Sequence, residues 1–277
     1  PELAAFVVLT ADRDLQDWLP RCPVIVQVTT LAEAEKALAA GANGLIAKGQ
    51  ESGGPVGEES SFVLLQRVAD LARARRVPVW CQGGIGMHTA AAAVAGGAFG
   101  VVLDSQLALL AECHLPEDIK TDLRAMDGSE TRLLGGYSVY SRPGLTVAEY
   151  DALPAEQVRA LMSAQGERRA LPVGQDAALA RPLAAQCASV EALLNALRVG
   201  MVGHLHQAVN LDVLREHNPL AVAHGLRYPV AQGPMTRVSD TAAFAAAVAE
   251  NGALPFLALS LMHEAGARKL LEETRAA

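Results

Sequence analysis

Five short runs of aliphatic residues without polar alternation constrain the fold of this chain most. They lie at positions 5–10, 24–29, 44–49, 77–83 and 100–105. Such runs suit strands that are buried on both faces, which is the environment that a parallel sheet provides. We therefore predict a parallel sheet built from the front of the chain.

Helical patterns with capping signals separate these runs. Thr30 and Glu33 stand in the capping-box relation before a helix that we expect to end at Gly41, and residues 61–75 and 89–95 repeat that role. The strand starts recur every ~20 to 33 residues, a spacing typical of βα units. The chain has 277 residues, enough for one barrel of ~250 residues. The fold class that we predict is α/β, of the (β/α)₈ TIM-barrel type.

The pattern changes between residues 112 and 227. Prolines and glycines interrupt this stretch repeatedly. We expect one helix that begins near Thr146 and a second over residues 189–209, whose apolar side chains recur on one helical face. We expect no buried strand here, so this stretch is predicted to be a helical linker or insert.

The pattern of strands and helices resumes after residue 227. We predict strands over 228–235 and 253–259 with a helix over 241–250 between them, and a final helix over 264–277. Three regions follow from these patterns. They are the carboxy-terminal half of a barrel over 1–111, the linker over 112–227, and an amino-terminal βαβ unit of a barrel over 228–277.

Composition and charge exclude several classes of function. The formal net charge is −7 and no Lys/Arg stripe alternates with aromatic residues, which argues against nucleic-acid binding. Apolar stretches are broken well before the ~20 residues that cross a bilayer. The four cysteines form no Cys-x-x-Cys pair, so we expect reduced thiols and no metal site. We therefore predict a cytoplasmic protein with neither nucleic-acid nor membrane partners.

Glycines crowd the ends of two successive predicted strands. One loop contains Gly49, Gly53 and Gly54, and the next contains Gly83 and Gly84. In a parallel α/β fold the carboxyl ends of the strands form the active face, where backbone N–H groups can hold a phosphate. The two loops favour a phosphate-bearing ligand, although tight turns alone would also account for the glycines.

Four stretches of the sequence resemble the nitronate monooxygenase (2-nitropropane dioxygenase-like) family, which includes flavin-dependent enoyl reductases. They are residues 41–57, 78–86, 95–107 and 232–235. The resemblance implies a (β/α)₈ barrel that binds FMN, with the phosphate held at Gly83 and Gly84. The residues that it assigns to the cofactor are Gly49, Gly53, Gly54, Gly83, Gly84, Ile85, Ser105, Gln232, Gly233, Pro234 and Met235.

The order of these motifs differs from the order in the family. The motif of the family's first strand, here residues 232–235, follows those of its sixth, seventh and eighth strands. Either the barrel is permuted or the chain joins the end of one barrel to the start of another, and we favour the second because both ends look cut. Tandem barrels of this type resemble parts of polyketide- or fatty-acid-synthase-like polypeptides. We accordingly expect other domains of the same polypeptide as partners.

Two residues depart from the family pattern. Pro55 stands where family members carry a histidine near the flavin, and Asp104-Ser105 stands where they carry a Gly-Thr pair that helps to hold the phosphate. A carboxylate ~4 Å from a phosphate costs about 1 kcal/mol in water and ~4 kcal/mol in a partly desolvated site. FMN affinity should therefore be reduced unless Asp104 turns away to cap the next helix.

Three residues are candidates for the catalytic chemistry. Lys48 ends a predicted strand and should point toward the barrel mouth, Glu51 lies in the first glycine loop, and His88 follows the second. Each also has a structural interpretation: a surface lysine with a buried stem, a solvated loop carboxylate, and a histidine at a helix start.

The leading hypothesis is an FMN-dependent oxidoreductase that acts on a small-molecule or acyl substrate within a larger polypeptide. One alternative is a non-catalytic, degenerate barrel that serves as a scaffold or docking domain, which Pro55 and Asp104 favour. A second alternative is a lyase or isomerase barrel for phosphorylated sugars. The glycine loops would suit that barrel, but it would leave residues 232–235 unexplained.

Overall fold

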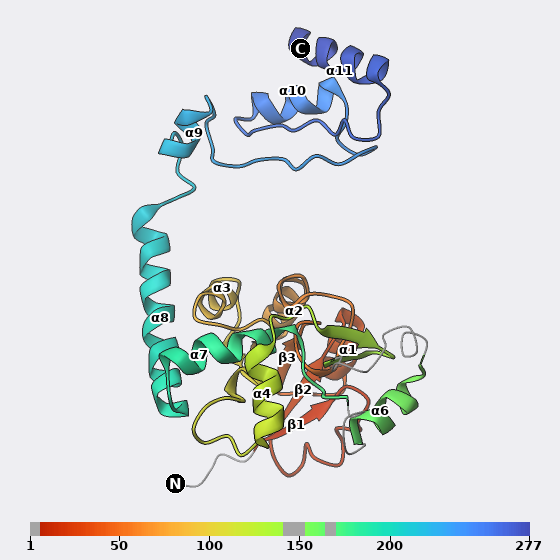
Figure 1. Ribbon diagram of the computed structural model, residues 1–277, viewed down its shortest axis with the longest axis vertical. Coiled ribbons are helices and arrows are strands. Elements are labelled where there is room, and N and C mark those ends of the chain that lie inside the picture. Colours follow the sequence, from red (N-terminus) through yellow and green to blue (C-terminus); the bar gives the residue numbers. More distant parts are fainter. Residues whose placement is uncertain (1–5, 141–152, 164–169) are drawn as a thin grey trace. The chain divides into compact units, whose positions relative to one another are not determined.

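The computed structural model describes residues 6–140, 153–163 and 170–277 (Figure 1). The chain divides into two compact units, Pro1–Leu205 and His206–Ala277, and each is considered by itself. Within the described ranges, no helix combines the length and the apolar character that a membrane crossing requires.

Unit 1 is built on a sheet of five strands in the order β1-β2-β3-β5-β6. Every neighbouring pair in this sheet is parallel. The strands are β1 (Val7–Thr10), β2 (Val24–Val28), β3 (Gly44–Lys48), β5 (Val79–Gln82) and β6 (Gly100–Val102). The prediction of a parallel sheet from the five aliphatic runs is confirmed, with each strand shorter than its run.

Three helices connect successive strands of this sheet. They are α1 (Leu31–Ala39), α2 (Ser61–Arg75) and α3 (Thr89–Ala95). Thr30 caps α1, because its hydroxyl accepts the Glu33 N–H while a Glu33 carboxylate oxygen accepts the Thr29 N–H. The αL conformation of Arg76 ends α2. These capping interactions explain why the sequence predicted the helix boundaries well.

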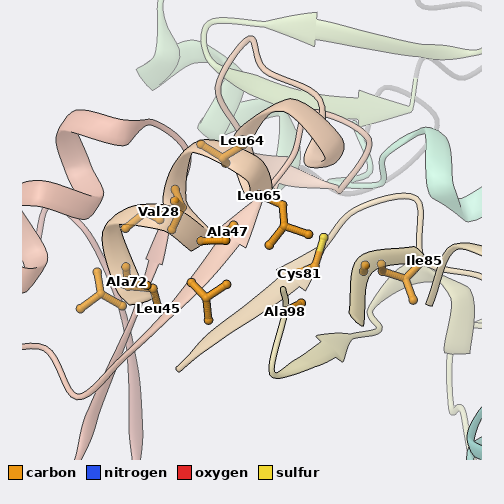
Figure 2. Packing of buried hydrophobic residues seen from close by; sticks show 14 of the residues in the cluster. Val28, Leu45, Ala47, Leu64, Leu65, Ala72, Cys81, Ile85 and Ala98 are labelled. Atoms are coloured by element: carbon orange, nitrogen blue, oxygen red, sulfur yellow. The ribbon is translucent and has the colours of Figure 1, made fainter. Parts of the chain in front are cut away.

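One face of the sheet packs against the helices to form the main core. Val24, Val26 and Val28 are fully buried on this face, as is Leu45 of β3. Figure 2 shows Leu65 of α2 near Ala47 of β3 and Cys81 of β5, and Leu64 and Leu45 belong to the same cluster. Because side chains alternate along a strand, the residues between these face the opposite way.

The opposite face of the sheet lines an apolar cavity of about 1010 Å³ together with α8 (Val190–Leu211). Trp80 occupies this face, and its ring leaves no room for side chains at its neighbours. A Cβ atom added to Gly44 or to Gly100 would lie 2.8 Å from a ring atom of Trp80. The sequence therefore places glycine on both sides of the tryptophan.

The stretch from residue 112 contains strands, so the prediction of a helical linker without strands is wrong. β7 (Thr131–Leu134) and β8 (Tyr137–Tyr140) form an antiparallel hairpin, and β8 also pairs with β4 (Gly54–Pro55). Gly135 and Gly136 both have positive φ angles, which a two-residue hairpin turn requires. This Gly-Gly pair was read as a linker signal, although two strand-like runs flank it.

The remaining elements of unit 1 are helical. They are η1 (Ser105–Leu107), α4 (Glu117–Ala125), α6 (Ala155–Ser163), η2 (Gln175–Leu179), α7 (Ala180–Gln186) and most of α8. The helix start expected near Thr146 lies outside the described residues, and α8 confirms the helix expected over 189–209. Residues up to 205 share one compact unit with the sheet, while the predicted boundaries at 111/112 and 227/228 stay predictions.

Unit 2 contains α9 (Pro219–Ala223), α10 (Ala242–Glu250) and α11 (Glu264–Ala276). The strands predicted over 228–235 and 253–259 are reduced to one parallel bridge, between Ala231 and Leu254. A parallel pair of this length has few hydrogen bonds, and sheets of fewer than three strands are rarely stable. The two predicted strands are therefore wrong in length, because the structure has a single bridge in their place. Whether the chain forms a permuted barrel or parts of two barrels stays a prediction.

The packing of α2 on the sheet provides a test of the core. Leu64 is fully buried, whereas Phe62 on the same helix is 49% exposed. Leu64→Ala should lower the free energy of unfolding by about 2–5 kcal/mol because it leaves a cavity. Phe62→Ala, the matched control, should change it by less than about 1 kcal/mol. Urea denaturation followed by circular dichroism measures both, and similar losses would contradict this arrangement.

Candidate active site

The carboxyl ends of β3, β5 and β6 bring polar side chains together at one edge of the sheet. Lys48 and Gln82 are paired in register at the ends of β3 and β5, and Asp104 follows β6. The loop after β3 and residues 171–176 of the stretch after the sheet lie against the same edge, because a Cβ added to Gly53 would lie 2.1 Å from the Pro172 carbonyl oxygen. The sequence analysis predicted the active face at this edge of the sheet.

Lys48 is buried, with 4% of its surface exposed. Burial lowers its pKa, and the charges of Asp104 and Asp176 partly oppose that effect. In the part of the chain that the structure describes, no carboxylate forms an ion pair with Lys48 within 4.0 Å. Lys48 is therefore a buried cation near acidic groups rather than a surface lysine.

Glu51 binds the amino-terminal end of α2. Its Oε2 atom accepts the Ser61 backbone N–H at 2.9 Å, and a negative charge at this end of a helix is favourable. The contact also explains Gly49, where a Cβ atom would lie 2.2 Å from the Ser61 nitrogen and 2.3 Å from Glu51 Oε2. In this arrangement Glu51 positions the loop, and its carboxylate already has a structural partner.

A pair of carboxyl groups, Asp104 and Asp176, occupies the same edge. Asp104 accepts a hydrogen bond from Gln82 Nε2 at 2.8 Å and one from the Ser105 N–H at 2.5 Å. Asp176 Oδ2 accepts one from Gln106 Nε2 at 3.2 Å. The Gly84 N–H and the Asp104 carboxyl both approach Asp176, while its Oδ1 atom makes no hydrogen bond of standard geometry.

The environment of Asp176 favours its neutral form. Burial is the largest cause, and the nearby charges of Asp104 and Glu51 act in the same direction; together they raise its pKa to about 8. Asp176 is thus mostly protonated at neutral pH. A neutral Asp176 beside Asp104 avoids placing two like charges side by side.

Two residues of this cluster, Gln106 and Asp176, were missed by the sequence analysis. Gln106 is fully buried, and its amide nitrogen also donates to the Ile85 carbonyl. Asp176 comes from η2, about 70 residues further along the chain, in a stretch interpreted as linker. No local pattern connects the two positions. The contact is produced by tertiary packing alone.

The second glycine loop, with Gly83 and Gly84, has the backbone geometry that a phosphate cradle needs, but the space beside it is already filled. Gly83 and Gly84 have positive φ angles, as a backbone cradle requires. However, a Cβ on Gly83 would lie 3.1 Å from Glu51 Oε2 and 3.2 Å from Ser52 Oγ.

The FMN phosphate that the resemblance implies does not fit this arrangement. The Gly84 N–H faces Asp176, the Ser105 N–H donates to Asp104, and the Asp104 N–H donates to Gln106 Oε1 at 2.9 Å. A phosphate here would meet acidic side chains instead of free backbone donors. We therefore derive no reaction step through a flavin.

His88 and Cys81 stand apart from this hydrogen-bonded network. The Nδ1 atom of His88 lies 3.0 Å from Nε2 of His204 on α8, at the surface. Cys81 faces the core, where burial raises the pKa of its thiol to about 12, so it is a poor nucleophile. All four cysteines are free.

Unit 2 holds the motif over 232–235 by its own contacts. Gln232 Nε2 donates to the buried Ser239 hydroxyl at 2.9 Å, and its Oε1 accepts the Phe256 N–H at 3.1 Å. The Gln232 backbone N–H donates to the Leu254 carbonyl at 2.9 Å. Met235 is 47% exposed. The glutamine side chain thereby links the two segments that were predicted as strands.

Comparison with known proteins agrees with the architecture of unit 1. The family model described as nitronate monooxygenase matches residues 16–146, a range that includes β2, β3, β5 and β6. Residues 16–146 are thus similar to the nitronate monooxygenase family over slightly less than half of the chain. A comparison with curated protein sequences gives no match.

Solved structures of the same fold include FabK from Thermotoga maritima. The chain is 22% identical to it with a TM-score of 0.63, over 74% of this chain and 70% of FabK. An M276A mutant of the same protein gives 24% identity and a TM-score of 0.62, over 74% of this chain and 69% of that one. Nitroalkane oxidase from Streptomyces ansochromogenes is 22% identical with a TM-score of 0.53, over 72% of this chain and 63% of its own. The predicted α/β fold of the TIM-barrel type is confirmed.

The raised pKa of Asp176 predicts a pH-dependent stability. The folded state keeps a proton that the unfolded chain releases between the ordinary value of 3.8 and the raised value of about 8. This contribution is therefore complete below the ordinary value and is lost as the pH rises toward 8. Asp176→Asn stays neutral throughout, so at pH 8 its melting temperature should exceed that of the wild type by more than about 4 °C, because each unit of pKa shift corresponds to about 1.4 kcal/mol of unfolding free energy.

Thermal denaturation between pH 5 and pH 8.5 measures this difference. The gap between Asp176→Asn and the wild type should widen as the pH rises. Asp70→Asn removes an exposed carboxylate on α2 and serves as the matched control, for which we expect a small gap that does not change with pH. Parallel curves for Asp176→Asn and the wild type would contradict a protonated Asp176.

Proposed function

We propose that this chain is part of an oxidoreductase barrel of the nitronate monooxygenase type that uses FMN and belongs to a larger, synthase-like cytoplasmic polypeptide. The observation that carries the proposal is the family match over residues 16–146. That range contains both glycine loops and the strand ends that present Lys48 and Asp104. The partners that we propose are the other domains of the same polypeptide.

The position of Lys48 supports a catalytic role for this edge of the sheet. Active sites of α/β barrels lie at the carboxyl ends of their strands, and Lys48 is the last residue of β3. Burial lowers the pKa of Lys48, so this ammonium group gives up its proton more readily than that of an exposed lysine. Glu51 and His88 remain weaker candidates, because one is bound to α2 and the other faces His204 at the surface.

A second cavity beside Asp104 supports the substrate class. It has a volume of about 520 Å³, within the range of small-molecule sites. Asp104 and Ser105 lie at its edge, and most of the remaining wall is aliphatic, including Leu107, Ile119 and Leu123. A wall of this kind suits a small apolar molecule or an acyl chain.

The main alternative is a non-catalytic barrel region that acts as a scaffold or docking domain. The carboxyl pair in the phosphate cradle favours it, since this cradle cannot hold a phosphate as described. Pro55 favours it as well, because it pairs with Tyr137 in the sheet of β4 and β8 and carries no titratable group. The same filled cradle argues against a lyase or isomerase for phosphorylated sugars.

Flavin content separates the two functions. The polypeptide that contains this chain, purified from its own cells, should be yellow and should release FMN on denaturation. Absorbance near the flavin bands and mass spectrometry of the released ligand measure this. A colourless protein that takes up no added FMN, either as the wild type or with Asp176→Ala, would favour the scaffold and would contradict the oxidoreductase.

Pro55 predicts weak oxidation of alkyl nitronates. Removal of a positioned acid or base typically lowers the rate ~10²- to 10⁴-fold, so turnover should fall below that of family members with histidine at this position by about that factor. Oxygen consumption with an alkyl nitronate measures it, and Pro55→His should recover part of the loss. Wild-type turnover equal to that of such members would show that another residue, such as Lys48, transfers the proton.

A further inference from the structure

We infer that residues 171–179, here called the strap, are an autoinhibitory element that occupies the site of a ligand phosphate with the side chain of Asp176. This inference rests on the proposed function, because it concerns the phosphate cradle of that same site. It explains how the chain keeps both phosphate-binding glycines and yet offers no open cradle to a phosphate.

The strap packs against the first glycine loop by close backbone contact. The Asp176 N–H donates to the Glu51 carbonyl at 3.0 Å. A Cβ atom on Gly174 would lie 2.2 Å from the Glu51 carbonyl oxygen, and one on Gly53 would lie 2.1 Å from the Pro172 carbonyl oxygen. The two segments therefore fit only because glycine stands on each side of the contact.

The other end of the strap is held by the small sheet. The Tyr140 N–H donates to the Leu171 carbonyl at 2.9 Å, which extends the edge of β8. Leu171 is 3% exposed and packs with Leu123 of α4 and Tyr140. The strap thus lies between the hairpin and the glycine loops, and its course is fixed at both ends.

Asp176 stands in the cradle as an anionic ligand group would. It lies against the Gly84 N–H and is 3% exposed. Its Oδ1 atom is buried without a hydrogen bond, which is costly unless a donor is available at that position. A carboxyl oxygen in this place uses the donors that a phosphate oxygen would otherwise use.

Charge reinforces the exclusion of a phosphate. Asp104 and Glu51 lie beside Asp176, and Lys48 is the cation among these four groups. A phosphate dianion would have to displace the neutral acid and then remain near two carboxylates. Entry of a phosphate-bearing ligand therefore requires that the Asp176 carboxyl leave the cradle, either by removal of this side chain or by displacement of the strap that carries it.

Two substitutions test the strap in different ways. Asp176→Ala removes the carboxyl and leaves the strap in place, whereas Gly174→Ala forces the strap away from Glu51. Asp70→Asn is the control, because it removes one negative charge from the exposed surface of α2. Isothermal titration of the 277-residue chain at pH 7, first with inorganic phosphate and then with FMN, measures binding in each protein.

We expect Asp176→Ala and Gly174→Ala to bind inorganic phosphate at least tenfold more tightly than the wild type, and Asp70→Asn to equal the wild type. Hydrogen exchange at the Gly84 and Ser105 amides should accelerate in Gly174→Ala, which reports strap release without any ligand. If Gly174→Ala does not fold, phosphate binding by Asp176→Ala alone tests the strap.

The outcomes separate the strap from the proposed function. Variants that bind phosphate more tightly than the wild type, but not FMN, support the strap and argue against a flavin cofactor. A wild type that binds phosphate or FMN as tightly as the variants overturns the strap and leaves the oxidoreductase standing. Folded variants that bind neither phosphate nor FMN more tightly than the wild type overturn the strap. An equal increase in affinity in Asp70→Asn also overturns it, because it would indicate a net-charge effect.

Discussion

The parallel register of β3 with β5 is the interaction on which the rest of unit 1 depends. It aligns Lys48 with Gln82, and the pairing of β5 with β6 aligns Gln82 with Val102, two residues before Asp104. Parallel strands end at the same edge, so three chemically different side chains converge without any sequence proximity. Burial of the strands on both faces holds this register, because a shift by one residue would exchange the core face and the cavity face.

The glycines of this edge serve close packing. Gly49 allows Glu51 to reach the start of α2, Gly53 allows the approach of Pro172, and Gly174 allows the approach of Glu51. In a family whose glycine loops the resemblance assigns to a cofactor, this chain uses the absence of Cβ atoms to bring three segments together. The same residues can therefore indicate a ligand site in a sequence and a tertiary contact in the structure.

Local signals predicted the sheet and its helices well. The boundaries of α2 and α3 agree with the sequence prediction, because apolar periodicity is a local signal and, for α2, so are the Ser60 hydroxyl cap and the αL residue Arg76. The hairpin of β7 and β8 could have been predicted by the same reasoning, because Gly135-Gly136 is a turn signal between strands. The sequence analysis instead interpreted this pair as part of a linker. The contact between Asp176 and Gln106 could not be predicted from local signals, because it depends on how residues 171–179 return to the sheet. Glu51 was identified, but its bond to Ser61 depends on the position of α2.

Trp80 and its two glycine neighbours have a consequence for how this fold can change in evolution. The indole ring fills the space above Gly44 on β3 and Gly100 on β6, so neither position tolerates even a methyl group while the tryptophan is present. Replacement of Trp80 by a smaller residue would release both constraints at once and would leave a void until one of the glycines is replaced. Three positions on three strands, far apart in the sequence, should therefore be inherited as a single steric unit, and homologues should exchange them together.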